Sequence, residues 1–370
     1  MEESNMQKSA DAKYRYWLTH ITGIGNVKIQ RLLDYAGDAR AVYYMKEKEL
    51  EGILNITKRD ITEIVKSRKK WDLEGEYERF LTSGIIMVTR EEEKYPKRLR
   101  NISYPPYALF YKGMLPKEDR KSIAIVGARS CSEYGKHYAI ELGQMVAKAG
   151  LSVISGMAMG IDGAGHYGAM LCGGATYAVL GCGVDYCYPS SNRRLYDYMA
   201  EHGGLIAEYV PGTQPVGKLF PQRNRIISAL SDVVVIVEAR ERSGSLITAD
   251  FALEQGKDIY ALPGRISDAL SAGCNRLIRQ GAGMIISIED FLAEIEVSCS
   301  SGDTIAGFSQ KVLEKEERLV YSVVDLLPKH IEEILIDTQM DIGRLCSILA
   351  RLENLKMVRE VHRNYYIRIR

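Results

Sequence analysis

No apolar run in this 370-residue chain approaches the roughly 18 residues that a membrane-spanning helix needs, so the sequence predicts no membrane partner. The first residues, MEESNMQKSADAKYRYW, are too polar and acidic for a secretory signal peptide, which leads us to expect a cytoplasmic protein. The chain also lacks an excess of either charge, with 49 Lys and Arg against 48 Asp and Glu. Any contact with nucleic acid must therefore depend on local clusters of basic residues.

The usual signatures of catalysis and metal binding are also missing. The seven cysteines are scattered, and the closest pair, Cys182 and Cys187, matches neither a CxxC redox motif nor a zinc site, so we expect reduced thiols. No Ser-His-Asp set and no phosphate-transfer lysine motif stands out. Asp162 and His166 lie one helical turn apart as a candidate pair, but a structural histidine is the simpler interpretation. We expect no catalytic residues, no metal and no cofactor.

From Ser122 onward, short and nearly continuous apolar stretches alternate with helical stretches. This alternation is typical of an α/β domain with a Rossmann-like parallel sheet covered on both faces, which we place at residues 105–292. The expected strands are Ile123–Val126, Leu151–Ile154, Ala175–Leu180, Leu205–Ala207, Val233–Val237, Asp258–Leu262 and Met284–Ile286. The expected helices are Tyr134–Ala149, Gly163–Cys172, Ser191–His202, Arg223–Leu230, Ser245–Gln255 and Asn275–Gln280.

Residues 1–80 have the apolar spacing of helices, and we expect them to form a small helical domain, SAM-like or helix-hairpin-helix-like. Within it, Thr22-Gly23-Ile24-Gly25 separates two helical stretches, and such a turn exposes backbone N–H groups of the kind that hold a DNA phosphate. A helical module that contacts only protein is the alternative, and the sequence leaves both open. Residues 81–104 are expected to be a connector with strand-like pieces.

The C-terminal part of the chain changes class. Residues 293–310 are rich in Ser, Gly and Thr and are expected to be a linker. Residues 311–370 then predict a winged-helix-like domain, with helices at Lys311–Leu327, Ile331–Asp337 and Asp341–Leu355 and strands at Met357–Val361 and Tyr365–Ile369. A winged helix reads duplex DNA with its third helix or serves as a protein-contact module, and the sequence leaves both open.

The strand expected at Ile123–Val126 runs into a glycine-bearing turn and a helix, which is how parallel-sheet proteins form an anion pocket. A dinucleotide site there requires G-x-G-x-x-G and an acidic residue at the end of the second strand. In this chain Arg129 takes the place of the second glycine, and the second strand ends in Ser155-Gly156. The turn therefore predicts a phosphodiester held by a guanidinium rather than a nicotinamide cofactor.

Two more glycine-rich turns follow later strands, at Ser155–Gly163 and Gly181–Asp185. A single turn of this kind is often only a tight connection. Because the carboxyl ends of parallel strands meet at one edge of a sheet, three such turns favour a common binding site.

The segment GKLFPQRNR at residues 217–225 is the most specific part of the chain. It places Lys218, Arg223 and Arg225 around Phe220, and no acidic residue occurs between positions 211 and 230. Cations beside an aromatic ring suit single-stranded nucleic acid, whose phosphates pair with the charges and whose bases stack on the ring.

These side chains also have structural interpretations, which the sequence leaves open. Phe220 belongs to the core in that case, and Arg225 pairs with Glu238 or Asp232. Arg129 makes a salt bridge on a helix face.

A further turn, Arg242-Ser243-Gly244-Ser245, follows the strand expected at Val233–Val237. Ser243 or Ser245 is suited to cap the next helix. The hydroxyls and the backbone N–H groups also form a candidate phosphate cradle, so both interpretations stand.

Six motifs together resemble the DprA/Smf family of DNA-processing proteins. They occur in family order and spacing and cover residues 105–290: VGARSCSEYG, ISGMAMGIDGAGH, VLGCGVDYCYP, FPQRNRIISALS, VEARERSGSLITADFALEQG and ALPG followed by GCNRLIRQGA. The resemblance implies a homodimeric, cytoplasmic protein that binds single-stranded DNA, shields incoming DNA in natural transformation, helps to load the recombinase RecA and assists displacement of single-strand-binding protein. It also implies DNA-binding positions at Gly127, Arg129, Ser155, Gly156, Gly160, Lys218, Phe220, Arg223, Asn224 and Arg225.

Three other functions stay open on the residues alone. A nucleoside-monophosphate phosphoribohydrolase of the LOG group shares a related sheet, but its P-G-G-x-G-T-x-x-E pattern needs a Glu that Ser243–Phe251 lacks. A nicotinamide-dependent oxidoreductase is disfavoured by Arg129. A regulator that reads duplex DNA would depend on the C-terminal domain alone.

Overall fold

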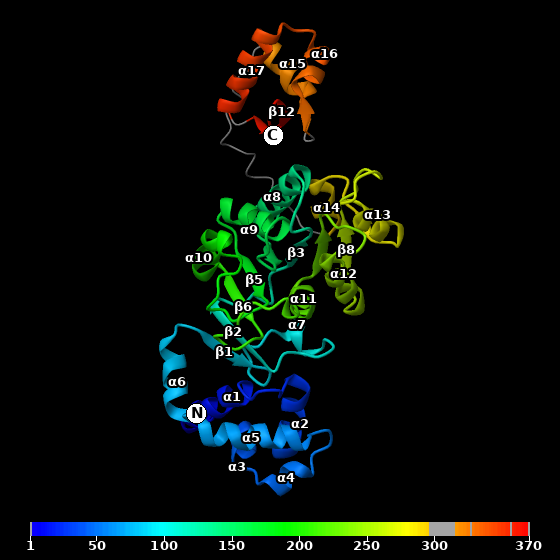
Figure 1. Ribbon diagram of the computed structural model, residues 1–370. Coiled ribbons are helices and arrows are strands. Elements are labelled where there is room, and N and C mark those ends of the chain that lie inside the picture. Colours follow the sequence, from blue (N-terminus) through cyan, green and yellow to red (C-terminus); the bar gives the residue numbers. More distant parts are fainter. Residues whose placement is uncertain (1, 296–314, 326–327, 356, 369–370) are drawn as a thin grey trace.

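The computed structural model describes residues 2–295, 315–325, 328–355 and 357–368, and a nine-stranded sheet forms its centre (Figure 1). The strand order is β1-β2-β6-β5-β4-β3-β7-β8-β9. The strands from β6 to β9 in this order are parallel, whereas β1 and β2 run antiparallel at one edge. The strands are β1 (Ile86–Thr89), β2 (Ala108–Gly113), β3 (Ser122–Val126), β4 (Ser152–Ser155), β5 (Thr176–Leu180), β6 (Gly204–Ala207), β7 (Val233–Ile236), β8 (Asp258–Ala261) and β9 (Gly283–Met284).

All seven strands expected between residues 122 and 286 are present, with ends shifted by a residue or two. Five consecutive buried residues in β3 and in β5 explain why these strands read as continuous apolar runs. In β3, Ile123 and Ile125 pack on one face of the sheet, and Ala124 and Val126 pack on the other. The mostly parallel α/β sheet predicted from the alternating pattern is confirmed.

Helices cover both faces of the sheet, as two separate cores show. One core packs against α8 (Glu133–Lys148), α9 (Ile161–Leu171) and α14 (Ile288–Glu294). The other packs against α7 (Lys97–Arg100), α11 (Leu219–Leu230), α12 (Gly244–Glu254) and α13 (Ala272–Arg279). The 3-10 turn η1 (Ser190–Asn192) leads into α10 (Arg193–His202), which packs at the β6 end.

Residues 81–104 contain the strand-like piece expected there, but they are not a connector. Strand β1 lies within this segment and pairs with β2, which in turn pairs with β6, so both strands belong to the central sheet. With four residues, one of them exposed, β1 gives too short an apolar pattern to identify its partner from sequence. The domain boundary proposed at residue 105 therefore cuts through the sheet.

Helix α11 begins at Leu219, four residues before the expected start at Arg223. Pro221 lies in the first turn of the helix, where proline is tolerated because its missing N–H has no intrahelical partner. The early start carries Phe220 on a helix rather than on a loop.

The N-terminal helices pack directly against the β2–β6 end of the sheet. They are α1 (Glu2–Thr19), α2 (Asn26–Ala36), α3 (Ala39–Tyr44), α4 (Glu47–Glu51), α5 (Lys58–Lys70) and α6 (Leu73–Thr82). Their core is continuous with that of the sheet, since the ring of Tyr16 lies 4.5 Å from the Phe80 ring and 6.4 Å from the Phe110 ring of β2, centre to centre. The predicted turn at Thr22–Gly25 separates α1 from α2.

The C-terminal residues form a separate group with its own core and a three-stranded sheet (Figure 1). Its elements are α15 (Lys315–Val323), β10 (Lys329–His330), α16 (Ile331–Thr338), α17 (Ile342–Asn354), β11 (Val358–His362) and β12 (Tyr365–Arg368). Strand β10 was not expected. The start of the predicted helix at 311–327, its last two residues and most of the predicted linker lie outside the described residues.

Candidate functional site

A crevice of about 340 Å³ opens at the carboxyl ends of β3, β4 and β7. The chain passes from β3 to β4 on one side and later returns to place β7 on the other side of β3. Ligands of open α/β sheets bind at this kind of strand-order reversal, because loops leaving in opposite directions make a cleft there. The first turn of α9 and the start of α11 complete the walls.

The crevice brings together seven of the twelve positions singled out from the sequence: Gly127, Arg129, Phe220, Arg223, Asn224, Ser243 and Ser245. Among its other lining residues are Gly217, Pro221 and Arg242, and Asp162, which the sequence suggested only as a catalytic candidate. Gly217 and Arg242 belong to the segment GKLFPQRNR and to the turn Arg242-Ser243-Gly244-Ser245, but the sequence analysis proposed neither of them as a binding position.

Arg129 and Phe220 form one wall of the crevice. The Arg129 side chain is exposed, and its guanidinium carbon lies 5.4 Å from the centre of the Phe220 ring, within the range of a cation–π contact. In the part of the chain that the structure describes, Arg129 makes no ion pair. The Phe220 ring is half-buried above Gly181, where a Cβ atom would come within 2.6 Å of it. The helix-face salt bridge considered for Arg129 is therefore wrong.

Arg223 lies buried beneath the same ring, 5.9 Å from its centre. Its guanidinium donates to the backbone oxygens of Gly156, at 3.0 Å, and Val179. Burial lowers the pKa of Arg223 to about 10, so the side chain stays charged at neutral pH. Gly156 leaves the space for it, because a Cβ atom there would lie 2.5 Å from a guanidinium nitrogen. The charge beneath the crevice is therefore permanent.

Asp162 and His166 do not form the candidate catalytic pair. The buried Asp162 carboxylate accepts from the Gly156 N–H at 3.1 Å, and burial raises its pKa while the charge of Arg223 opposes that rise. The His166 Nδ1 lies 2.6 Å from the Thr176 hydroxyl, and burial lowers the pKa of His166 to about 3. The structural interpretation of this histidine is the correct one.

The start of α12 faces the crevice from the β7 side. The Ser245 N–H donates to the Ser243 hydroxyl at 3.4 Å, and the two hydroxyls lie 2.8 Å apart. Ser243 is therefore the N-cap, as one interpretation proposed. The first turn of α12 contains no acidic residue, and Arg242 is exposed beside it, so this helix end keeps its positive partial charge.

The start of α8 is closed by an internal carboxylate. Glu238 accepts from the Ser132 N–H at 2.9 Å and from the Ser132 hydroxyl, and it fills the space above Gly135. In dinucleotide-binding proteins the corresponding helix start holds the pyrophosphate. Because Glu238 already satisfies these donors, the nicotinamide alternative loses its phosphate site.

The placement of Arg225 in this crevice needs a correction, because its side chain does not reach it. It makes a two-bonded ion pair with Glu208, at 2.6 and 2.9 Å, and its Nε donates to the Tyr104 oxygen at 3.1 Å. Both partners considered for it from the sequence were wrong. Residues two apart on a helix point in directions that differ by about 200°. Arg223 faces the crevice, so Arg225 faces away.

The four remaining positions, Ser155, Gly156, Gly160 and Lys218, do not line the crevice. The Ser155 hydroxyl donates to the Ile125 oxygen at 2.6 Å and joins β4 to β3. Gly160 has a φ of 77° and packs on the backbone of Ala128, so it shapes the second loop. Lys218 is exposed at the N-cap of α11, beside the crevice-lining Gly217.

The described residues offer no metal, disulfide or membrane-spanning feature. Among them, no group of three or more His, Cys, Asp and Glu side chains is arranged to hold a metal ion. The six cysteines in the described ranges are all unpaired. No described helix is both long and apolar enough to cross a membrane.

Comparison with known proteins places the sheet and its crevice in one family. Residues 86–296 match the model of the family described as DNA recombination-mediator protein A. The chain is 42% identical over 224 residues to DNA processing protein DprA of Streptococcus pneumoniae, covering 60% of this chain and 77% of that protein. It is 41% identical over 213 residues to that of Bacillus subtilis, covering 57% and 72%.

Two solved structures resemble the chain as well. DNA processing protein A of S. pneumoniae superposes with a TM-score of 0.67 at 35% identity, over 76% of this chain and 97% of that one. DNA processing protein A of Helicobacter pylori, described for its single-stranded DNA binding mode, superposes with a TM-score of 0.52 at 30% identity, over 57% and 95%. The family model spans more than half of the chain, and the resemblance drawn from its motifs is confirmed: this chain belongs to the DNA recombination-mediator protein A family.

Proposed function

We propose that the crevice binds single-stranded DNA with little sequence preference. The observation that carries this proposal is the Arg129 guanidinium over the Phe220 ring, without an ion pair among the described residues, at a site with no exposed acid in its lining. Stacking of a base on an aromatic ring tolerates any base, and a guanidinium beside it pairs with the phosphate that follows. The single-stranded DNA binding of the H. pylori relative supports the same assignment.

Each wall of the crevice has a role in this mechanism. Phosphates approach Arg129, Arg242 and the N–H groups at the start of α12, where the helix dipole favours an anion. Arg223 is buried beneath the Phe220 ring and adds a positive charge under the strand, which the Asp162 carboxylate beside it partly offsets. Lys218 and the loop that carries it extend the basic surface beyond the crevice. No step of this mechanism requires catalysis, so we propose a binding protein rather than an enzyme.

The cellular role that we infer follows the family. The protein would act in the cytoplasm, shield incoming single strands during natural transformation, help to load RecA and assist displacement of single-strand-binding protein. An open crevice suits this task, because a strand that is handed on must remain accessible along its length.

A homodimer is part of this proposal. Exposed apolar side chains gather on elements at the β8–β9 end of the sheet: Leu253, Ile266, Met284 and Ile286. In the sheet formed by the described residues, β9 is also an edge strand with one unpaired side. A second copy is the simplest partner for an unpaired edge flanked by apolar residues.

For the two end groups we propose the domain types expected from the sequence. The helices at residues 2–82 act as a SAM or helix-hairpin-helix-like domain, and the group at residues 315–368 acts as a winged-helix-like domain. The net charge of +4 in the segment from Arg351 to Arg370, with six basic and two acidic residues, supports a contact with nucleic acid for the second.

A binding experiment tests the proposal. We expect the full-length protein to bind a dT oligonucleotide more tightly than the matched duplex, and to lose affinity steeply between low and moderate salt. Equal or tighter binding of the duplex would contradict it.

Incubation with AMP tests the phosphoribohydrolase alternative, and we expect no free adenine because Asp162, the carboxylate among the lining residues, is buried.

A further inference from the structure

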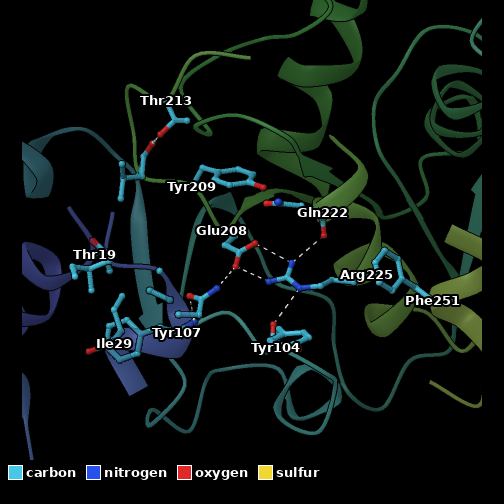
Figure 2. A pocket seen from close by; sticks show the side chains of 15 residues that line it. Thr19, Ile29, Tyr104, Tyr107, Glu208, Tyr209, Thr213, Gln222, Arg225 and Phe251 are labelled. Carbon is cyan, nitrogen blue, oxygen red and sulfur yellow. Dashed lines mark hydrogen bonds and ion pairs between the residues drawn. The ribbon is translucent and has the colours of Figure 1, made fainter. Parts of the chain in front are cut away.

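A second and larger cavity, of about 600 Å³, lies between the N-terminal helices and the sheet (Figure 2). The turn before α2 and the first residues of α2 form one wall, through Ile24, Gly25 and Asn26. Loops after β6 and before β2 and the outer faces of α11 and α12 form the others. Its size and its place between two packed units are those of a ligand site.

The back of this cavity is formed by polar side chains whose charges pair with one another. The Glu208 carboxylate accepts two hydrogen bonds from Arg225 and one from the Asn26 amide, and the Asn26 oxygen accepts from the Tyr107 N–H at 2.9 Å. Figure 2 shows the ion pair facing the open space. Because Glu208 neutralises Arg225, the cavity offers hydrogen bonds without a free charge, which suits an uncharged polar ligand better than a phosphate.

The side walls are aromatic, with Tyr104, Tyr107, Tyr209 and Phe251 all among the lining residues. The Tyr104 side chain is exposed at the rim, and those of Tyr209 and Phe251 are half-buried. Gln222 is exposed at the same rim, and within the described chain its side-chain amide has no hydrogen-bond partner. Aromatic faces together with an available amide match the stacking and edge bonding of a nucleobase.

Helix α11 lies between this cavity and the crevice and contributes to both. Phe220 and Arg223 line the crevice, whereas Gln222 and Arg225 line the cavity. The loop from β6 to α11 also touches both, through Thr213 at the cavity and Gly217 at the crevice. The Tyr209 hydroxyl, which donates to the Leu219 oxygen at 3.2 Å, fixes this loop to the start of the helix.

We propose that the cavity between the N-terminal helices and the sheet is a second base-binding site, which takes one unpaired nucleobase. This inference rests on the proposed function of the crevice. The base belongs either to the strand held in the crevice, which would follow the loop past Gly217, or to a free nucleoside. Both sources share the chemistry of a flat ring stacked between tyrosines, with its edge toward Gln222 and Glu208.

The test uses full-length protein and a dT oligonucleotide just long enough to reach from the crevice to the cavity, so that it binds in one register. One 2-aminopurine is moved along this strand, since stacking on an aromatic ring quenches this base. We expect quenching at two separate positions. Phe220→Ala removes it at one, and Tyr104→Ala removes it at the other and weakens binding about tenfold, as loss of one stacked base does. Tyr35→Ala, which removes another exposed tyrosine outside both sites, is the control and leaves both signals unchanged.

A variant that fills the cavity tests the second base-binding site independently. Thr213→Phe occupies the space from a loop position and removes the second signal, whereas Thr213→Ser keeps the hydroxyl bond to the Val210 oxygen and preserves it. Calorimetry with thymidine separates the two sources: binding that Tyr104→Ala abolishes, without a second quenched position in the strand, identifies a free nucleoside.

Two negative results have different meanings. One quenched position and no thymidine binding overturn the base-binding cavity and leave the crevice assignment intact. Failure of the wild-type protein to bind any oligonucleotide overturns the proposed function instead, and the thymidine titration still decides whether the cavity accepts a base.

Discussion

The guanidinium carbon of Arg129 lies 5.4 Å from the centre of the Phe220 ring, although the two residues are far apart in the sequence. Arg129 lies in the loop that follows the carboxyl end of β3, and Phe220 lies in the first turn of α11. Their contact joins a charge and a flat apolar face into one surface beside the crevice. This surface and the contacts that support it are open to direct test.

Arg129→Ala is expected to weaken binding of a dT oligonucleotide without changing stability, because this exposed side chain makes no ion pair within the described ranges. Loss of one phosphate contact reduces the slope of log affinity against log salt by about 0.7 for a single strand. Fluorescence anisotropy over a salt series measures both quantities. Arg193→Ala, which removes an exposed arginine paired with Asp197 on α10, is the control. Unchanged affinity and slope in Arg129→Ala would remove the main support for the crevice assignment.

Arg225→Ala is expected to destabilise the fold, because it leaves the Glu208 carboxylate buried without its partner. Breaking a buried pair of this kind costs about 3–5 kcal/mol, and both side chains here are about 10% exposed. Urea unfolding followed by circular dichroism measures the loss. The double variant Arg225→Met with Glu208→Leu is expected to recover most of it, since it removes both charges. Wild-type stability in Arg225→Ala, combined with lost DNA binding, would restore the direct role expected from the sequence.

Gly156→Ala is expected to weaken binding by displacing Arg223. The added Cβ atom would lie 2.5 Å from the guanidinium, which would then lose its bonds to the Gly156 and Val179 oxygens. Gly217→Ala is the matched control, because this glycine also lines the crevice but has open space within 4 Å of the point where a Cβ atom would stand. Anisotropy and thermal unfolding of the pair separate a steric effect on Arg223 from a general effect of alanine. Equal binding by both variants would contradict the role given to Gly156.

Acidification is expected to destabilise the protein in part through His166. Burial lowers the folded-state pKa of His166 to about 3, against 6.5 for an exposed histidine, so between these values the unfolded chain binds a proton that the folded chain excludes. The contribution of His166 to the free energy of unfolding is therefore at its full value above pH 6.5. It falls as the pH is lowered toward 3, by up to about 1.4 kcal/mol per pH unit. His166→Asn should unfold more easily than the wild type at neutral pH but show a flatter dependence on pH. A slope equal to that of the wild type would exclude His166 as the source.

Deletion of residues 311–370 is expected to leave most of the affinity for single strands, because all lining residues of the crevice lie between positions 126 and 248. The C-terminal group does contact α8 through an ion pair between Arg359 and Glu133, so a modest change is consistent with this expectation. Gel shifts of the truncated and full-length proteins on the same oligonucleotide measure the difference. Complete loss of binding would favour the alternative in which the C-terminal domain binds DNA by reading the duplex.

Much of this site was predictable because its signals are local. The apolar strands of the sheet, the turn at Gly127 and the cap at Ser243 each depend on neighbours within a few residues, and all were found where the pattern indicated. Apart from the start of α11, the errors concern partners distant in sequence. Nothing near β1 indicates that it pairs with β2, and nothing near Arg225 indicates Glu208.

Local pattern alone specified the alternation of strands and helices, the glycine turns at the strand ends and the run of basic residues at 217–225, because hydrophobic period and backbone freedom are properties of short segments. The packed fold assigned a direction to each basic side chain. Arg129 faces the crevice, Arg223 lies beneath it and Arg225 turns to Glu208, since the helical rotation of α11 and the position of the N-terminal helices settle which charges meet solvent and which meet a carboxylate.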